Sequence, residues 1–134
     1  MKKINILITD DDIDYLFQMK SKLQKQGFNI ITAESRKEAE HILASFRPDL
    51  CVFDMMMEED DSGLVLAHHC KNLYPDVPVI IATGVRSETG YSFDPESEND
   101  ASWIKADLFV EKGIATEQLE IQINKLLNKK HKNG

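Results

Sequence analysis

The chain has 134 residues and a mass of 15.3 kDa, with 42% hydrophobic and 29% charged residues, which suits one globular domain. Its 16 basic and 23 acidic side chains give a formal net charge of -7, which disfavours binding to nucleic acid or to anionic membrane surfaces. The apolar run at residues 4–8 stops at Thr9, before three aspartates, and is too short for a signal peptide or a membrane span. We therefore expect a cytoplasmic protein with one domain at residues 1–128, a short basic tail at 129–134 and no appended effector domain.

Five short apolar segments recur at nearly even spacing, and each has the composition of a buried strand. In chain order they are residues 4–9, 29–33, 50–53, 77–83 and 108–110. They are rich in Ile, Val, Leu and Phe and lack polar alternation, which is typical of parallel strands that helices cover on both faces.

Segments with helical periodicity alternate with these strands. The first ends at Gly27, a residue suited to the left-handed position after a helix. The second begins with the capping-box pair Ser35 and Glu38 and cannot continue past Pro48, while Thr116 can cap the last one. The expected inward-facing positions are Leu16, Met19 and Leu23, then Ala39, Ile42, Leu43 and Phe46, then Leu66, Cys70 and Leu73, and finally Leu119, Ile123, Leu126 and Leu127.

The segment between the fourth and fifth strands does not fit the alternation. Residues 84–100 contain two glycines, a proline and five acids, with Arg86 as the one basic side chain, and we expect a long loop followed by a short helix at 97–105. The remaining order of strands and helices predicts right-handed crossovers and an open, doubly wound parallel α/β sheet. We expect the flavodoxin-like strand order 2-1-3-4-5, with a shortened or irregular fourth helix.

Polar side chains gather where the predicted strands end. Asp10 and Asp11 follow the first strand, Asp54 follows the third, Thr83 ends the fourth, and Lys112 follows the fifth. Because sites in such sheets form at the carboxyl ends of the strands, we expect these side chains to converge. The three carboxylates would repel one another without a cation, and Mg²⁺ suits them because it leaves positions for phosphoryl oxygens. A carboxylate can also be the nucleophile that forms an aspartyl phosphate, with the lysine and the hydroxyl binding the phosphoryl oxygens.

The segments that carry these residues resemble the response regulator receiver domains of two-component signalling, of the stand-alone single-domain type. The resemblance covers residues 4 to about 127. Its motifs are Ile6-Leu7-Ile8-Thr9-Asp10-Asp11, Cys51-Val52-Phe53-Asp54-Met55-Met56-Met57, Ile80-Ile81-Ala82-Thr83 and Ala106-Asp107-Leu108-Phe109-Val110-Glu111-Lys112. Each motif alone is weakly specific, but their order on the expected elements is highly specific.

The resemblance implies that Asp54 accepts a phosphoryl group from a phosphohistidine, on a sensor histidine kinase or a phosphotransfer protein. It implies that Asp11, Asp54 and the backbone carbonyl of Met56 bind Mg²⁺ directly, and that Asp10 helps through water. The domain would then be a phosphoprotein that promotes its own phosphotransfer and dephosphorylation but is not otherwise an enzyme.

Three further residues have roles that the resemblance implies. Lys112 would contact the phosphoryl group, Thr83 would move to donate a hydrogen bond to it, and the Phe109 ring would turn inward. This is a population shift between two packings, and it would change the surface that an unidentified downstream protein binds. Homodimerisation on activation is a further expectation.

The sequence also departs from the usual pattern of the family. Gly113 follows Lys112 where a proline with a cis peptide bond is usual, and residues 58–61 form a longer, acidic loop without the usual proline. Met56 and Val85 are apolar at positions that flank the site, so they offer little to orient an attacking water. We therefore expect a long-lived phosphorylated state.

Three alternatives stand beside this interpretation. The aspartates at 10–12 can serve only to cap the first helix, because Asp is favoured at that position. A receiver-like interaction module would work without phosphorylation, which Gly113 and the loop at 58–61 favour. A phosphohydrolase would use Asp54 as its nucleophile, but it normally needs a second acid two residues later, where Met56 stands.

The cysteines and histidines indicate no further site. Cys51 and Cys70 lie in apolar runs, and we expect them to pack as small hydrophobic residues and not to form a disulfide. The histidines, which are not at metal-ligand spacing, are His41, His68, His69 and His131.

Overall fold

The computed structural model describes residues 3–57, 62–84 and 105–133, with side chains of the last helix described as far as residue 128. The elements are β1 (Asn5–Thr9), α1 (Ile13–Lys25), β2 (Asn29–Ala33), α2 (Arg36–Ser45), β3 (Leu50–Asp54), α3 (Ser62–Leu73), β4 (Val79–Thr83), β5 (Leu108–Glu111) and α6 (Thr116–Asn133). Most of the expected loop at 84–100 and short helix at 97–105 lies outside the described residues, as do Val85 and the acidic loop at 58–61.

The five strands form one parallel sheet in the order β2-β1-β3-β4-β5, so the predicted fold class and strand order are confirmed. Register brings the carboxyl ends of neighbouring strands to one edge: Thr9 pairs with Phe53, Asp54 with Ala82, and Thr83 with Glu111. The loops that leave this edge therefore start close together, although they are far apart in sequence.

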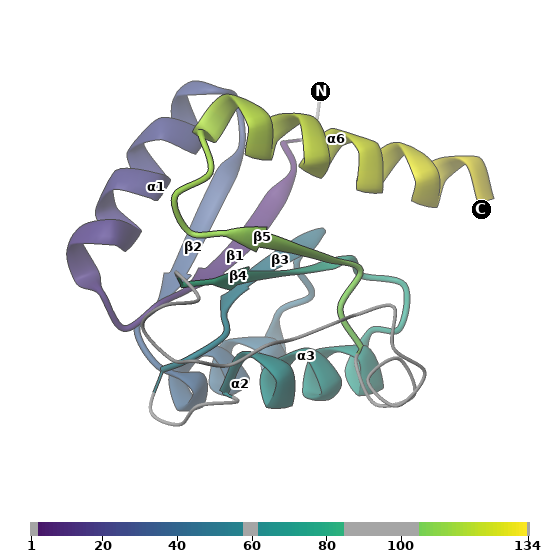
Figure 1. Ribbon diagram of the computed structural model, residues 1–134. Coiled ribbons are helices and arrows are strands. Elements are labelled where there is room, and N and C mark those ends of the chain that lie inside the picture. Colours follow the sequence, from purple (N-terminus) through teal and green to yellow (C-terminus); the bar gives the residue numbers. More distant parts are fainter. Residues whose placement is uncertain (1–2, 58–61, 85–104, 134) are drawn as a thin grey trace.

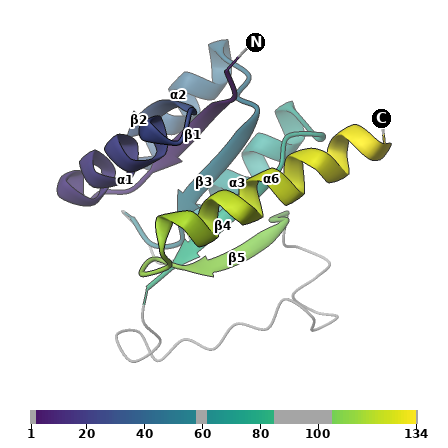
Figure 2. The same cartoon turned by 90° about the horizontal axis from the view of Figure 1, so that it is seen from above.

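Helices cover both faces of the sheet, with α1 and α6 on one face and α2 and α3 on the other (Figure 1). Seen from above, α1 and α6 lie over opposite halves of the sheet (Figure 2). The core accordingly has two parts. The part under α1 and α6 contains Ile6, Ile8, Leu16, Met19, Leu23, Val52, Ile80, Leu119 and Ile123, among others. The part under α2 and α3 contains Leu7, Ala39, Leu43, Cys51, Phe53, Leu66, Cys70 and Ile81, among others.

The predicted helix boundaries follow from local hydrogen bonds. Ser35 Oγ accepts from the Glu38 N–H at 3.1 Å, and the Glu38 carboxylate accepts from the Glu34 N–H at 2.6 Å. These bonds satisfy backbone donors at the start of α2. Gly27, just past α1, has a φ of 101°, so it takes the left-handed conformation that was expected of it.

Two details at helix ends differ from the expectation. Leu73 was expected to face inward but is exposed, because it ends α3 and the next residue, Tyr74, packs against the core instead. The Tyr74 hydroxyl also donates to the Leu43 carbonyl oxygen at 2.6 Å. The backbone of residues 129–133, expected as a tail, continues α6 to Asn133, since no glycine or proline interrupts the helix before that point.

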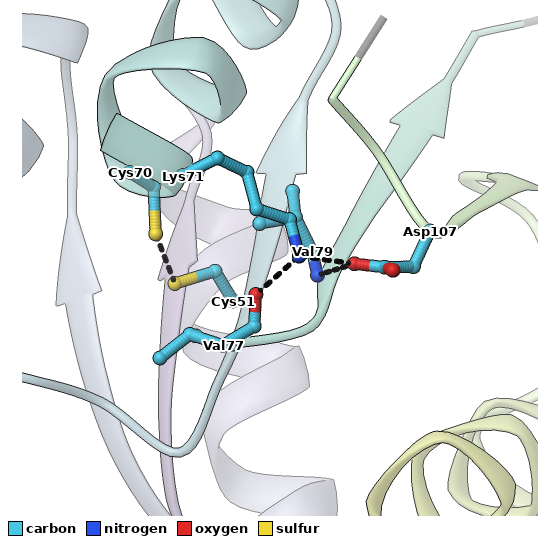
Figure 3. A network of polar contacts seen from close by, with 6 residues as sticks. All are labelled: Cys51, Cys70, Lys71, Val77, Val79 and Asp107. Carbon is cyan, nitrogen blue, oxygen red and sulfur yellow. Dashed lines mark hydrogen bonds and ion pairs between the residues drawn. The ribbon is translucent and has the colours of Figure 1, made fainter. Parts of the chain in front are cut away.

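Cys51 on β3 and Cys70 on α3 are both fully buried free thiols, as expected, and their sulfur atoms lie 3.8 Å apart (Figure 3). Burial, together with the contact with Cys70, raises the pKa of the Cys51 thiol well above its usual value. This pair therefore acts as part of the packing between β3 and α3.

Lys71, in the last turn of α3, ties together the beginnings of β4 and β5 (Figure 3). Its ammonium donates to the Val77 carbonyl oxygen at 2.7 Å and to Asp107 Oδ2 at 2.8 Å. The same carboxylate oxygen accepts from the Val79 N–H at 2.8 Å. This network, the Lys71 clamp, lies at the edge of the sheet opposite the carboxyl ends of the strands.

Candidate functional site

Three carboxylates come together at the carboxyl edge of the sheet. Oxygen atoms of Asp10, Asp11 and Asp54 all lie within 4.8 Å of one another. Asp10 and Asp54 are buried, whereas Asp11 is exposed. In the described part of the chain, this is the group of acidic, histidine or cysteine side chains with the spacing of metal ligands.

Backbone pairing beyond the strand ends holds these acids. The Asp10 N–H donates to the Ala33 carbonyl oxygen at 3.2 Å, and the Met55 N–H donates to that of Ala82 at 2.9 Å. Asp10 thus continues the line of β1 for one residue beyond the strand, and Asp54, the last residue of β3, is held by the pairing of the residue after it.

The three aspartates at residues 10–12 have different roles: one caps α1, and the other two belong to the carboxylate cluster. Asp12 is the N-cap of α1, and its side chain accepts from the Tyr15 N–H at 3.2 Å. Asp10 Oδ1 accepts from the Asp12 N–H at 2.9 Å, so the loop between β1 and α1 is fixed by two side-chain bonds. Capping therefore accounts for Asp12 but leaves Asp10 Oδ2 and Asp11 available to the site.

Lys112 lies over the acids from the end of β5. Its Nζ is 2.7 Å from Asp10 Oδ2 and 3.9 Å from Asp54 Oδ2. The Lys112 N–H donates to the Thr83 carbonyl oxygen at 2.9 Å, which keeps its backbone beside β4. The described residues contain no cis peptide bond, so the chain passes from Lys112 to Gly113 through a trans bond.

The charges of the cluster are unbalanced. Burial raises the pKa of Asp54 to about 7, and the negative charge of Asp10 adds to this rise. Burial also raises the pKa of Asp10, although its hydrogen bond with Lys112 opposes the change. For Lys112, burial favours the neutral amine, but the bond with Asp10 and the charge of Asp54 outweigh it and raise the pKa. One ammonium faces three carboxyl groups, so the cluster favours a further cation.

Gly63, in the first turn of α3, brings this helix against the backbone that follows Asp54. Its N–H donates to the Met55 carbonyl oxygen at 2.8 Å. A Cβ at Gly63 would collide with the Asp54 carbonyl oxygen and lie 2.7 Å from the Met55 Cα. A glycine in the first turn of a helix, where alanine is the better helix former, was the signal in the sequence that such a close approach exists.

Tyr15, in the first turn of α1, is a second residue near the site that sequence reasoning missed. Its ring is half-buried against the core under α1 and α6, and Lys112 Nζ lies 4.7 Å from the ring centroid. Tyr15 lies in the first turn of the helix that follows the acidic pair, and this closeness in sequence was the available signal.

Thr83 and Phe109 lie on the two neighbouring strands at the β4–β5 side of the site. The Thr83 hydroxyl donates to the Val110 carbonyl oxygen at 3.3 Å. The Phe109 ring is half-buried and packs against the core part under α2 and α3. Met56 is partly exposed, two residues beyond Asp54, and its backbone N–H acts on the Asp54 carboxylate as a hydrogen-bond donor.

The sequence matches the response regulator receiver domain family over residues 6–124. The chain belongs to this family. Response regulator MprA of Mycolicibacterium vanbaalenii is 29% identical over 127 residues, which cover 94% of this chain and 51% of that protein. The transcriptional regulatory protein GlrR of Escherichia coli K12 is 34% identical over 82 residues, 61% of this chain and 18% of that protein. The chain thus spans about half the length, or less, of these relatives.

Solved receiver domains have the same fold. A CheY-like receiver domain protein of Methanospirillum hungatei superposes with a TM-score of 0.81 at 23% identity, covering 99% of this chain and 100% of its own. The response regulator TrrA of Thermotoga maritima was solved in complex with Mg²⁺ and BeF. It superposes with a TM-score of 0.74 at 28% identity, covering 92% of this chain and 98% of its own. None of the helices in the described residues has both the length and the apolarity for a bilayer crossing.

Family membership makes the chain a signalling module of two-component systems, in which receiver domains interact with histidine kinases or phosphotransfer proteins and bind Mg²⁺ in an acidic pocket. The residues present fit such an ion. Three carboxylates supply the oxygen ligands that Mg²⁺ prefers. Burial and then the charge of Asp10 raise the pKa of Asp54, and a bound cation would oppose both effects.

Proposed function

We propose that Asp54 is the phosphoacceptor of this receiver domain. The observation that carries the proposal is its position: a buried carboxylate at the end of β3, with carboxylate oxygens of Asp10 and Asp11 within 4.8 Å and the Lys112 ammonium 3.9 Å away. A carboxylate held rigidly between a metal-binding pair and a lysine is suited to in-line attack on phosphorus. The donor would be a phosphohistidine on a sensor histidine kinase or a phosphotransfer protein.

In this transfer, an Asp54 carboxylate oxygen bonds to phosphorus while the phosphorus–nitrogen bond of the donor breaks and its electron pair stays on the imidazole. Lys112 binds a phosphoryl oxygen, for which its ammonium needs to move only from Asp10 toward Asp54. Asp10, Asp11, Asp54 and the Met56 carbonyl would hold Mg²⁺, which supplies positive charge to the phosphoryl oxygens when bound.

Output would pass through the strands β4 and β5. To donate to the phosphoryl group, the Thr83 hydroxyl would leave the Val110 carbonyl oxygen, and the Phe109 ring beside it would turn inward. The surface around these strands would then differ between the two states, and an unidentified downstream protein or a second copy of the chain would bind one of them. The cytoplasm is the compartment that we infer for this relay.

Two observations weigh against the alternatives. Gly113 leaves Lys112 in contact with both the Thr83 carbonyl and the Asp10 carboxylate, so the glycine does not remove the lysine from the site. An interaction module that needs no phosphorylation would not require a lysine held beside these acids. A phosphohydrolase would need an acid at the place of Met56, which carries no proton donor in its side chain.

The test is phosphorylation by a small donor. The protein is incubated with phosphoramidate and Mg²⁺, and its intact mass is measured. We expect the mass of one phosphoryl group to be added to the natural chain and to the control Asp76→Asn, which changes an exposed acid, but not to Asp54→Asn. Addition to Asp54→Asn at the natural rate would disprove the assignment.

A further inference from the structure

Few contacts determine where the Lys112 side chain lies relative to Asp54. Its backbone N–H is bonded to the Thr83 carbonyl oxygen, and a turn closed by the bond from the Ile114 N–H to the Glu111 carbonyl oxygen follows at 3.0 Å. Gly113 lies inside this turn, and a Cβ added to it would have no neighbour within 4 Å. Among the described residues, the Lys112 ammonium forms ion pairs with Asp10 and Asp54 and a contact with the Tyr15 ring, and we take these contacts to set the direction of the side chain.

The contact with Asp10 is at 2.7 Å the shortest of these, but it is not available in every state. In the proposed function the Asp10 carboxylate helps to hold a divalent cation, and a cation there competes with the Lys112 ammonium for the same oxygen. When the pairing with Asp10 weakens, the ammonium needs another contact that keeps it beside Asp54.

Tyr15 offers a contact that does not change with the charge of the acids. Its ring lies with the centroid 4.7 Å from Lys112 Nζ, within the range of a cation–π interaction. The ring is half-buried against the core under α1 and α6, and the N-cap bond from Asp12 fixes the backbone of Tyr15. The ring is thus a rigid surface on the side of the ammonium that faces α1.

We propose that Tyr15 is a positioning residue: its ring holds the Lys112 ammonium over Asp54 when Asp10 engages a cation. This inference rests on the proposed function for its effect on phosphorylation, but the contact itself is a property of the unphosphorylated protein. A cation–π contact of this kind corresponds to about a 2- to 30-fold effect on a rate that depends on the lysine. Tyr15 needs its ring for this role and not its hydroxyl.

The experiment compares Tyr15→Leu, Tyr15→Phe and the matched control Phe17→Leu, which removes an exposed ring from the same helix. Tyr15→Met is a second ringless variant of larger volume, in case the leucine variant does not fold. Phosphorylation rates are measured with phosphoramidate and Mg²⁺, in the natural background and in Lys112→Met. In parallel, NMR records the ε-methylene resonance of Lys112, which an aromatic ring beneath the ammonium shifts upfield.

We expect Tyr15→Leu and Tyr15→Met to be phosphorylated about 2- to 30-fold more slowly, and Tyr15→Phe and Phe17→Leu to keep the natural rate. In the Lys112→Met background the loss of the ring should have no further effect, because it acts through the lysine. The upfield shift should vanish in the ringless variants and persist in Tyr15→Phe.

An unshifted Lys112 resonance in the natural protein, or an equal loss of rate with and without Lys112, would overturn the inference. The two proposals fail in different ways. If the natural chain takes up no phosphoryl group, the proposed function fails, whereas the Lys112 resonance still decides whether Tyr15 holds the lysine.

Discussion

The ammonium of Lys112 is paired with Asp10, at 2.7 Å. Its distance from Asp54 Oδ2 is 3.9 Å, so the nucleophilic carboxylate that we propose shares this ammonium with Asp10 and has the longer of the two contacts. Asp54 is therefore buried without full compensation of its charge, and this imbalance governs how the stability of the domain depends on pH and on metal ions.

Replacing Asp54 with asparagine should stabilise the metal-free protein at high pH. The pKa of Asp54 is about 7 in the folded protein, against an ordinary pKa of 3.8 for an aspartate side chain. Between these two pKa values the unfolded chain releases the proton while the folded chain keeps it, so the free energy of unfolding falls as the pH rises. We expect Asp54→Asn to be more stable by about 2 to 4 kcal/mol near pH 8 and to lose this advantage near pH 4.

Urea unfolding in the presence of a chelator measures this difference, with Asp76→Asn as the control for an exposed acid. The control should show no comparable change with pH, because surface ion pairs contribute little. If the free energy of unfolding of Asp54→Asn exceeded that of the natural chain by the same amount near pH 8 and near pH 4, the explanation by burial of Asp54 would be wrong.

Mg²⁺ should stabilise the folded domain. Because the ion binds the assembled carboxylates and not the unfolded chain, each tenfold increase in concentration above the dissociation constant adds about 1.4 kcal/mol. Thermal unfolding with and without chelator is the measurement. We expect Asp11→Asn to abolish most of the stabilisation, and Asp14→Asn, an exposed acid in the first turn of α1 outside the cluster, to retain it. Protonation of Asp54 competes with the ion, so the stabilisation should weaken below about pH 7.

Gly63→Ala should destabilise the domain, although alanine is the better helix former. An added Cβ meets the backbone of Asp54 and Met55, which cannot move without shifting the Asp54 loop. The expected cost is about 1 to 3 kcal/mol, with slower phosphorylation. Gly113→Ala is the matched control, since nothing lies within 4 Å of its Cβ and the backbone there does not have a positive φ. Unfolding free energies that are the same for both variants would refute the close approach of α3.

Lys71→Met should destabilise the domain without slowing its phosphorylation. The variant removes the bonds to Val77 and Asp107 at the edge of the sheet opposite the site, and the expected cost is about 1 to 3 kcal/mol. Arg47→Gln breaks a more exposed ion pair with Asp76 and should cost less than about 1 kcal/mol. Phosphorylation by a small donor should proceed at nearly the natural rate in both folded variants, and a large loss in Lys71→Met would mean that the clamp reaches the site.

Local patterns in the sequence were enough to predict the strands and most helix ends. The capping pair at Ser35 and the glycine after α1 specify their structures through bonds within a few residues. The parallel topology followed from the alternation of strands and helices, because few connections are compatible with it. The convergence of the acids then depends only on which strand ends they follow.

The parts that were missed depend on contacts between distant segments. The contact between the Tyr15 ring and Lys112 joins residues almost a hundred positions apart. In the sequence alone, Tyr15 has the pattern of an ordinary core residue. Leu73 had the periodicity of a buried position, but the end of α3 turns it outward while Tyr74 packs. Periodicity gives the face of a helix and does not give the point at which the helix leaves the sheet.

The Lys71 clamp has a mechanical consequence. It joins Val79, at the start of β4, to Asp107, just before β5, whereas Thr83 and Lys112 lie at the far ends of the same two strands. If these strands shift relative to one another, the fixed end acts as a pivot and the displacement grows along their length. A small change in the spacing of the two strands would thus be amplified at the proposed phosphorylation site, and the opposite edge of the sheet would stay rigid.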